Sequence, residues 1–427
     1  MTIGRFLGLL LYAVPWLALA EPSAPIIPDT PAGHALAQWL SVFNSGERAK
    51  LQSFEDTHAP GWTLDEQIAA RARSGGYDLL SVDRADPLWI VFRVKDRAGS
   101  VTSVGNLVIA SSDPDHVSLL KLSAAGASTE LTLDDVWRSR VIDAAADLLA
   151  EHYLFPDVAE TTADRIRTQH KRGAYRNITD GQILATRLTD DLRAFSGDAH
   201  VAVDYSIKSM PSAGSPAHLR SGQVRYLGSN CGFEKTEHFA PNIGYLKLGF
   251  FAEPEICGSA ARAAMTLLSE RDAIIFDLRD NGGGVPRMAA LISSYLFDEP
   301  THLDDLYDRN LRVIEQFWAQ PGSPGTKKAA KRIFVLTSNR TFSAAEAFVY
   351  DLKSLSRATL IGETTAGGAH TVASHRIDAH FAIRVPFGQF INPITKTNWE
   401  RAGVQPDVKV PAADALDEAL KRARTRQ

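Results

Sequence analysis

Residues 332–355 read RIFVLTSNRTFSAAEAFVYDLKSL, and residues 273–284 read AIIFDLRDNGGG. Each stretch opens with a short apolar run rich in Ile, Val and Phe, which favours a buried strand. In the first stretch, Ser343 is followed by Phe348, Val349 and Leu352 at helical spacing. In the second stretch, three glycines follow the strand directly, as in a turn between a strand and a helix. Strand followed by helix, twice in one chain, predicts an α/β core.

The same alternation continues on both sides of these stretches. Further strand-like runs lie at 243–251 and 358–363, and further helix-like runs lie at 259–270 and 287–297. A last helix is expected from about residue 412, with Leu416 and Leu420 on one face. We therefore expect the core domain to cover residues 243–427.

Two segments ahead of the core have a different periodicity. Residues 131–204 show helical stripes and predict a helical subdomain, followed by a connector at 205–242. The two stripes consist of Trp137, Val141, Ala144 and Leu148, and of Leu184, Leu188, Leu192 and Phe195.

Residues 21–130 predict a separate α+β domain. One helix carries Leu36, Trp39 and Phe43, and strand-like runs such as 88–96 follow it. A helix followed by a curved meander resembles, by pattern, the α+β cone of the nuclear-transport-factor-two type, which SnoaL-like proteins also have. We expect this domain to dock a partner or recruit substrate.

The N-terminus has the layout of a signal peptide. Arg5 precedes an uncharged apolar stretch that ends in ALA at 18–20. The stretch is shorter than the roughly 20 residues of a membrane-spanning helix, so removal of residues 1–20 is favoured over an uncleaved anchor. The sequence therefore predicts a periplasmic or secreted protein with no stable membrane insertion.

The net charge and the cysteine count exclude some classes of partner and site. Lys and Arg number 46 against 50 for Asp and Glu, a formal charge of −4, which argues against a nucleic-acid-binding surface. Cys231 and Cys257 are the two cysteines, too few for a disulfide scaffold and without the spacing of a metal or redox site. In an oxidising compartment the two cysteines could pair, and two buried thiols are the alternative.

Four positions are candidates for chemistry. Ser343 opens a helix, where the positive end of the helix dipole favours an oxyanion, although Ser343 and Glu346 also have the spacing of a capping box. His200, in FSGDAHVAV, is the first candidate for a base and His370 the second, because histidine titrates near neutral pH. Glu400 is a candidate third member that orients the base.

The glycines at 282–284 leave backbone N–H groups uncovered, so an anion can approach them. A dinucleotide loop is the alternative, but its GxGxxG spacing is absent. A plain strand-to-helix turn is the simplest interpretation of the three glycines alone.

Four ordered motifs carry a family resemblance: DLRDNGGG, TSNRTFSAAEAF, GETTAGGAH and NWERAGVQPDV. Together they resemble the tail-specific, or C-terminal-processing, serine peptidases, in the branch related to the tricorn core protease and to interphotoreceptor retinoid-binding protein. The resemblance implies a Clp-protease-like or crotonase-like α/β spiral core behind a helical subdomain.

The resemblance also implies roles for particular residues. Ser343 would be the nucleophile, with His200 and Glu400 completing the site. The backbone amide of Ala344, with that of Gly282 or Gly283, would form the oxyanion hole.

The chain departs from the family pattern at three places. The region AGGAHTV (366–372) has no lysine for a Ser/Lys dyad, and Ala199 stands where the tricorn branch has a serine. The stretch between Val203 and Ile243 is too short for the PDZ domain that the family often carries.

We therefore expect an exported serine peptidase that cleaves peptides or unfolded chains through an acyl-enzyme on Ser343, with no metal and no organic cofactor. A non-catalytic carrier of hydrophobic ligands on the same fold is the alternative, and an esterase is a third. The oligomeric state is left open.

Overall fold

The computed structural model describes residues 25–58, 64–124, 131–211, 223–224, 226–240, 242–322 and 331–425. The expected signal peptide at 1–20 and part of the expected connector at 205–242 lie outside these residues. The chain divides into two compact units. The first holds the described residues up to Ile109 together with Pro114–Ala124, and the second holds Ala110–Asp113 and the described residues from 131 onwards.

The first unit is a four-stranded antiparallel meander packed against helices. The strands follow the order β1-β2-β3-β4. Its elements are α1 (Pro31–Ser45), α2 (Arg48–His58), α3 (Leu64–Ser74), β1 (Tyr77–Asp86), β2 (Trp89–Asp96), β3 (Thr102–Ala110) and β4 (Asp113–Ala124). Trp39 and Phe43 of α1 are fully buried, as their spacing predicts, and Gly46 ends the helix in a left-handed conformation.

Where one helix was expected in this unit, its described residues form three. The residues of α2 and α3 are mostly polar, and each helix buries only a few side chains, among them Leu51, Phe54 and Ala70. Short helices with so narrow an apolar face give a weak periodic signal, which explains the error.

The second unit begins with three helices, α4 (Asp135–His152), α5 (Pro156–Lys171) and α6 (Gly181–Ser196), in the stretch where helical periodicity was expected. Its α6 stripe is buried at Leu184, Leu188 and Leu192. Of the stripe expected on α4, Val141 is buried, and the other three positions are each about one residue away from the buried face. Trp137, Ala144 and Leu148 are only half-buried, and the buried face of α4 consists of Arg138, Val141, Ile142, Ala145, Ala146 and Leu149.

The core of the second unit is a six-stranded sheet with the order β15-β12-β11-β8-β7-β6. All neighbours are parallel except the edge strand β6. The strands are β6 (Phe233–Ala240), β7 (Ile243–Leu248), β8 (Ala273–Asp277), β11 (Arg332–Thr337), β12 (Thr359–Gly362) and β15 (Val408–Lys409). This confirms the α/β class, although β6 extends the core ten residues ahead of the boundary expected at 243.

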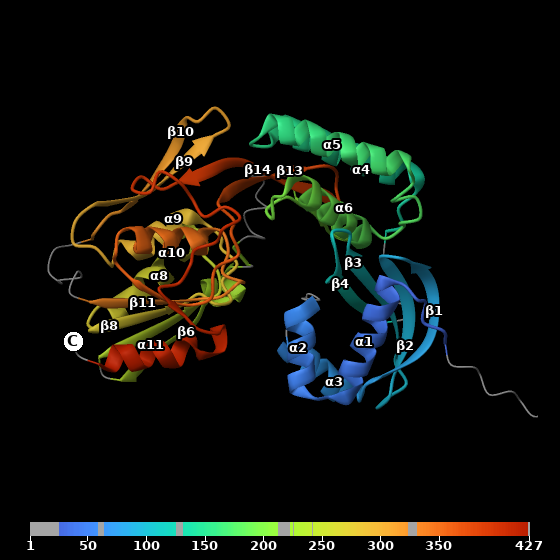
Figure 1. The fold of residues 1–427 in the computed structure, drawn as a ribbon, viewed down its shortest axis with the longest axis horizontal. Coiled ribbons are helices and arrows are strands. Elements are labelled where there is room, and N and C mark those ends of the chain that lie inside the picture. The colour runs from blue at the N-terminus through green and yellow to red at the C-terminus, as the bar shows by residue number, and fades with distance from the viewer. Residues whose placement is uncertain are drawn as a thin grey trace, which may run out of the picture. The chain divides into compact units, whose positions relative to one another are not determined.

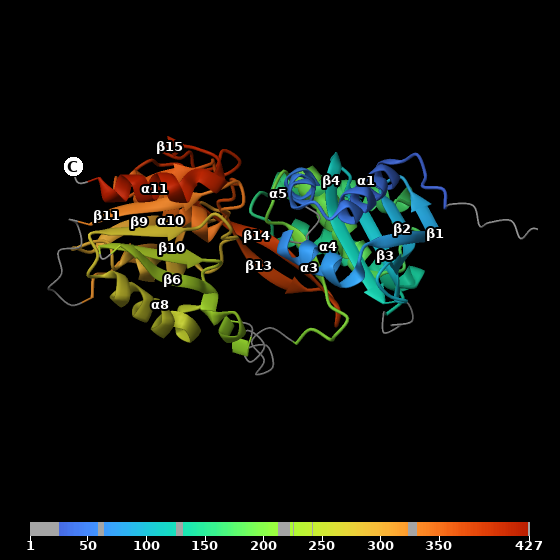
Figure 2. The same ribbon diagram turned by 90° about the horizontal axis from the view of Figure 1, so that it is seen from below.

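Helices cover both faces of this sheet. Ile274 and Phe276 of β8 face one apolar cluster with α8 (Pro254–Leu268), α9 (Pro286–Ser293) and α10 (Ala344–Ser354). Ile275, between them, faces the opposite cluster with α11 (Ala415–Arg424). Figures 1 and 2 show α8 and α11 on opposite sides of the sheet. Burial on both faces explains why these strands read as unbroken apolar runs.

A second, antiparallel sheet connects the core to the helical subdomain. Its order is β10-β9-β14-β13, and β5 also pairs with β14. The strands are β5 (Ala202–Tyr205), β9 (Thr301–Asp308), β10 (Val313–Ala319), β13 (His370–Arg376) and β14 (Phe381–Ile391). One end of β14 pairs with β5, directly after α6, and the other end pairs with β9. In Figure 1, α4 and α6 lie beside β13 and β14.

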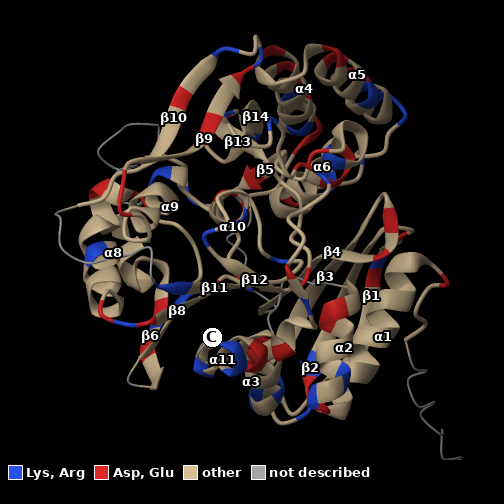
Figure 3. Ribbon diagram, turned by 60° about the vertical axis from the view of Figure 1, so that its left-hand side comes forward, with Lys and Arg blue, Asp and Glu red and all other residues tan. Residues whose placement is uncertain are grey.

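Two surface properties complete the description. None of the helices in the described part of the chain is long and apolar enough to span a membrane. Figure 3 shows both acidic and basic residues along α8 and α11.

Candidate active site

Ser343 lies on a strained turn between β11 and α10. Its backbone has φ 56° and ψ −121°, a combination that a residue with a side chain adopts only when its surroundings enforce it. The preceding residue is held by a hydrogen bond from the Phe342 amide to the Asn281 carbonyl, 3.0 Å. The Ser343 amide donates to Glu346 Oε2 at 2.9 Å, so the predicted capping box is formed. The serine therefore stands at the N-terminus of α10, where the helix dipole favours negative charge.

The glycine turn after β8 packs directly against this serine. A Cβ added to Gly283, whose φ is +99°, would lie 2.7 Å from Ser343 Cβ and 3.1 Å from the Ala344 nitrogen. The Gly283 amide is engaged, because it donates to Asn281 Oδ1 at 2.8 Å. Asn281 is itself fully buried and donates to the Leu248 carbonyl at 2.8 Å. Within the described residues, no acceptor is recorded for the amides of Gly282 and Ala344.

His200 approaches from the helical subdomain. It follows α6 and Gly197, which ends that helix in a left-handed conformation, and it precedes β5. Its ring stacks on Phe342, next to Ser343, with 4.4 Å between centroids. Only 7% of His200 is exposed, and neither ring nitrogen has a hydrogen-bond partner within the described structure. A hydrogen bond between Ser343 and His200 is therefore not formed in this state.

Asp198 is the centre of a buried polar cluster. Its Oδ1 accepts from the His200 backbone amide at 2.9 Å and lies 3.5 Å from His200 Nδ1. Its Oδ2 pairs with His370 Nδ1 at 2.6 Å and accepts from the Tyr153 hydroxyl at 3.0 Å. Burial alone would raise the pKa of Asp198, but its close contacts with His200 and His370 hold that pKa well below its usual range. Asp198 is therefore an ionised carboxylate.

Tyr153 keeps its proton in this cluster. Burial, with the neighbouring Asp198 charge, raises the pKa of its hydroxyl far above the ordinary value. It can therefore act as a permanent donor to Asp198.

Glu400 lies beside His370. Its Oε2 accepts from the Ala369 amide at 2.6 Å and lies 3.7 Å from His370 Nδ1. Among the described residues Glu400 forms no ion pair with His200, whereas Asp198 lies 3.5 Å from His200 Nδ1 and 2.6 Å from His370 Nδ1. The second-choice base, His370, thus belongs to the same cluster as the first choice.

Glu346 does more than cap α10. Its carboxylate is fully buried and accepts from the amides of Gly367 and Gly368 at 2.7 and 2.8 Å, and from the Thr365 hydroxyl. Burial raises the pKa of Glu346, partly offset by these donors. It ties the serine turn to the loop that leads into β13.

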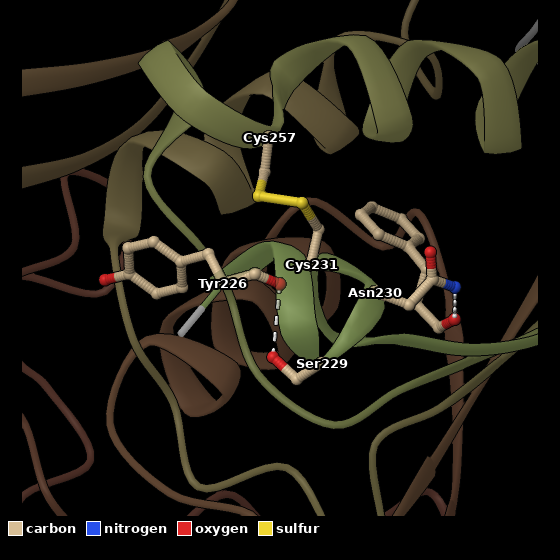
Figure 4. Close-up of a disulfide and its surroundings, with 6 residues drawn as sticks. Tyr226, Ser229, Asn230, Cys231 and Cys257 are labelled. Carbon is tan, nitrogen blue, oxygen red and sulfur yellow. Dashed lines mark hydrogen bonds between the residues drawn. A yellow bond between two sulfur atoms is a disulfide. The ribbon is translucent and has the colours of Figure 1, made fainter. Parts of the chain in front are cut away.

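Cys231 and Cys257 form a disulfide in the structure, with Cα atoms 5.7 Å apart. The bond joins the turn before β6 to α8 (Figure 4). It lies in the same unit as Ser343.

Sequence reasoning missed two members of the site, Asp198 and Tyr153. The sequence does contain a signal for Asp198. It follows the end of α6 and stands two residues before His200, and an aspartate side chain commonly accepts a hydrogen bond from the backbone amide two residues later. Tyr153 has no such signal. Its contact with Asp198 spans 45 residues and arises only when α4 packs beside the end of α6.

Two parts of the sequence match known family descriptions. Residues 242–410 match peptidase family S41, and residues 137–223 match the "N-terminal domain of Peptidase_S41 in eukaryotic IRBP".

Among curated proteins, the chain is 28% identical over 242 residues to carboxyl-terminal-processing peptidase 2, chloroplastic, of Arabidopsis thaliana. The match covers 54% of this chain and 44% of the relative, so the chain spans less than half of that protein's length.

Solved structures with a related arrangement include a putative peptidase from Parabacteroides merdae, with a TM-score of 0.47, 19% identity, and 68% of this chain and 98% of that one covered. The tricorn protease matches with a TM-score of 0.43 and 14% identity, over 82% of this chain and 41% of that one.

Proposed function

Because the chain belongs, through residues 137–223 and 242–410, to peptidase family S41, we propose that it is a serine peptidase with Ser343 as its nucleophile. The observation that carries the proposal is the strained backbone of Ser343 at the start of α10, packed against the glycine turn at Gly283. A purely structural capping serine does not require this conformation, since capping residues ordinarily adopt extended backbone angles.

The reaction begins with attack of Ser343 Oγ on the carbonyl carbon of the substrate. His200 takes the hydroxyl proton as the C–O bond forms, and the carbonyl oxygen becomes an oxyanion. The amides of Ala344 and Gly282 are the proposed donors to that oxyanion, because the Gly283 amide is already bound to Asn281. The oxyanion then collapses to a carbonyl and the C–N bond breaks as His200 gives its proton to the leaving amine, which leaves an acyl-enzyme on Ser343. Water attacks this ester by the same route and releases the acyl group.

Asp198 is the carboxylate that we propose to orient His200. It is ionised, only 1% exposed and bound to the His200 backbone. Tyr153 and His370 hold it in turn. A shift of the His200 ring by a few tenths of an ångström would convert the 3.5 Å separation from Asp198 Oδ1 into a hydrogen bond. Catalytic hydrogen bonds of this kind are often long before substrate binds.

That Glu400 orients the base stays a prediction. Its contacts make this effect on His200 indirect. Through Ala369 and His370 it would act on the loop beside the base. The variants Asp198→Asn and Glu400→Gln test the roles of the two carboxylates separately. We expect Asp198→Asn to lower the rate of substrate hydrolysis on the order of 100-fold or more, and Glu400→Gln to lower it less.

The proposed substrate is a peptide or an unfolded protein chain. The family assignment favours an amide substrate, and an activated serine is also compatible with ester hydrolysis. The ligand-carrier alternative predicts no turnover at all.

We also propose that the protein is exported. The apolar stretch that ends at Ala20 and the Cys231–Cys257 disulfide both fit an oxidising compartment. N-terminal sequencing of protein recovered from the periplasm or the medium is expected to start at Glu21.

The decisive experiment is intact-mass detection of a fluorophosphonate adduct on the wild-type protein. One adduct is expected, and it should be absent from Ser343→Ala and strongly reduced in His200→Ala. Ser53→Ala and His238→Ala, at exposed positions, are the matched controls and should label like the wild type. Labelling that persists in Ser343→Ala would disprove the proposed nucleophile.

A folded wild-type chain that does not label would disprove the hydrolase proposal. Hydrophobic-ligand binding would then be the next measurement.

A further inference from the structure

Asp198, His200 and His370 form a compact set of three metal-binding side chains. Each offers one ligand atom, and these atoms lie within 4.8 Å of one another. All three residues are buried, at 1%, 7% and 6% exposure. They come from two elements that the second sheet brings together, because His200 precedes β5, His370 opens β13, and both strands pair with β14.

The spacing of His200 and Asp198 is close to that of two ligands bound to one ion. His200 Nδ1 and Asp198 Oδ1 are 3.5 Å apart. Two ligands bound to one tetrahedral zinc ion at about 2.0–2.1 Å are separated by about 3.3 Å.

The unpartnered state of His200 is a second, independent observation. Both ring nitrogens are buried without an acceptor or donor in the described structure. Buried imidazole nitrogens are usually hydrogen-bonded, and a missing partner calls for an explanation. A metal ion would supply one.

The donor set favours a transition-metal ion. Two imidazole nitrogens and one carboxylate oxygen match Zn²⁺, whereas Mg²⁺ and Ca²⁺ prefer oxygen ligands. Three protein ligands also leave a fourth position open for water.

We propose that Asp198, His200 and His370 bind Zn²⁺ and that the bound ion inhibits the enzyme reversibly. Binding exchanges the hydrogen bond between Asp198 and His370 for two metal bonds, and a proton on a coordinating nitrogen moves to the other nitrogen of that ring or to solvent. The inhibitory part rests on the proposed function, because a metal-bound His200 can no longer accept the proton of Ser343. Metal binding itself does not depend on that function.

The test has two readouts on the full mature protein. Titration with Co²⁺, a spectroscopic stand-in for Zn²⁺, should give the visible absorption of a tetrahedral complex at one equivalent, and Zn²⁺ should displace it. Calorimetry should show one Zn²⁺ site, weakened at least tenfold in His370→Ala and in Asp198→Asn. Circular dichroism of both variants establishes that they are folded.

His375→Ala is the discriminating control. The rings of His152 and His375 stack elsewhere in the same unit, with their centroids 4.0 Å apart. This pair is the alternative histidine site for a metal ion. Binding that survives His370→Ala and Asp198→Asn but is lost in His375→Ala would overturn the proposal, and so would the absence of any Zn²⁺ binding.

Fluorophosphonate labelling of the wild type tests inhibition separately. One equivalent of Zn²⁺ should suppress labelling at least tenfold, and a chelator should restore it. Labelling unaffected at saturating Zn²⁺ would refute inhibition, whereas a protein that binds Zn²⁺ but never labels would refute only the proposed hydrolase.

Discussion

At the scale of single residues, the position of the His200 ring depends on Gly368, which has no side chain. A Cβ on Gly368 would lie 2.6 Å from His200 Cε1 and 2.2 Å from Phe342 Cε2. Both contacts are shorter than any normal carbon–carbon contact, so the imidazole must move. Glycine at 368 therefore makes room for the stack of His200 on Phe342.

Gly368→Ala is expected to reduce fluorophosphonate labelling at least tenfold while the protein stays folded, because an error of about 1 Å in a catalytic group can cost on the order of 100-fold. Labelling kinetics and circular dichroism measure the two effects. Gly228→Ala, with nothing within 4 Å of the added carbon, is the control. Unchanged labelling in Gly368→Ala would show that His200 need not occupy the observed position.

A second residue-scale feature is a pair of buried carboxyl groups, Asp304 on β9 and Asp351 on α10. Burial raises the pKa of Asp304 to about 9 and that of Asp351 to about 8, and the two groups repel each other. Asp304 Oδ2 has no partner within the described structure, whereas Asp351 accepts from Asn392. The fold therefore favours the protonated forms.

The pair makes stability depend on pH. Because the folded-state pKa is raised, the contribution is fully present below the ordinary carboxyl pKa of about 4. It is lost as the pH rises through the folded-state values of about 8 and 9. Asp304→Asn removes the ionisation and places an amide donor beside Asp351. We expect it to raise stability at pH 8.5 by roughly 1–3 kcal/mol and to have little effect at pH 5.

Urea unfolding at the two pH values measures this difference. Equal effects of Asp304→Asn at both pH values would contradict a protonated pair.

At the scale of elements, the N-terminus of α10 is fixed by Glu346 rather than by the helix alone. One carboxylate accepts from Ser343, Gly367 and Gly368, so it joins the helix to the loop that positions His370. An amide in its place offers only one acceptor oxygen and turns an N–H group towards these donors.

Glu346→Gln is accordingly expected to destabilise the protein by roughly 2–4 kcal/mol and to abolish labelling. The exposed Glu299→Gln is the control. Thermal unfolding and adduct formation are the measurements, and a variant that labels at the wild-type rate would show that the tie to the loop is dispensable.

The elements also show how far sequence reasoning reaches. The runs at β8 and β11 and the helix after Ser343 are long, apolar and periodic, so their positions followed from the residues. By contrast, β13 is buried only at His370, and its other residues are half-buried or exposed, so its pairing with β14 decides its conformation. The cluster of Asp198 and His370 could not be predicted for the same reason. The two residues are 172 positions apart in the sequence and meet only through that sheet.

At the scale of the whole molecule, the disulfide stabilises one unit only. Cys231 and Cys257 are separated by 26 residues, both within the second unit. Closing a loop of this length stabilises a fold by about 3 kcal/mol in the chain-entropy estimate.

The double variant Cys231→Ser/Cys257→Ser is expected to lower the unfolding temperature of the second unit and to leave that of the first unchanged. Calorimetry with and without reductant follows both. If reductant still lowers the unfolding temperature of the double variant, that effect comes from something other than this disulfide.

The two units have separate apolar cores, and each residue of the proposed site lies in the second. A chain that starts at residue 131 keeps α4, the core sheet and the strands that hold His200 and His370. We expect it to fold and to label with fluorophosphonate within about twofold of the full-length rate, because no catalytic group has been removed. Peptide hydrolysis should fall further than labelling if the first unit recruits substrate, since a small probe does not need recruitment. Equal losses of labelling and hydrolysis in a folded truncation would instead mean that residues before 131 support the chemistry of Ser343 itself.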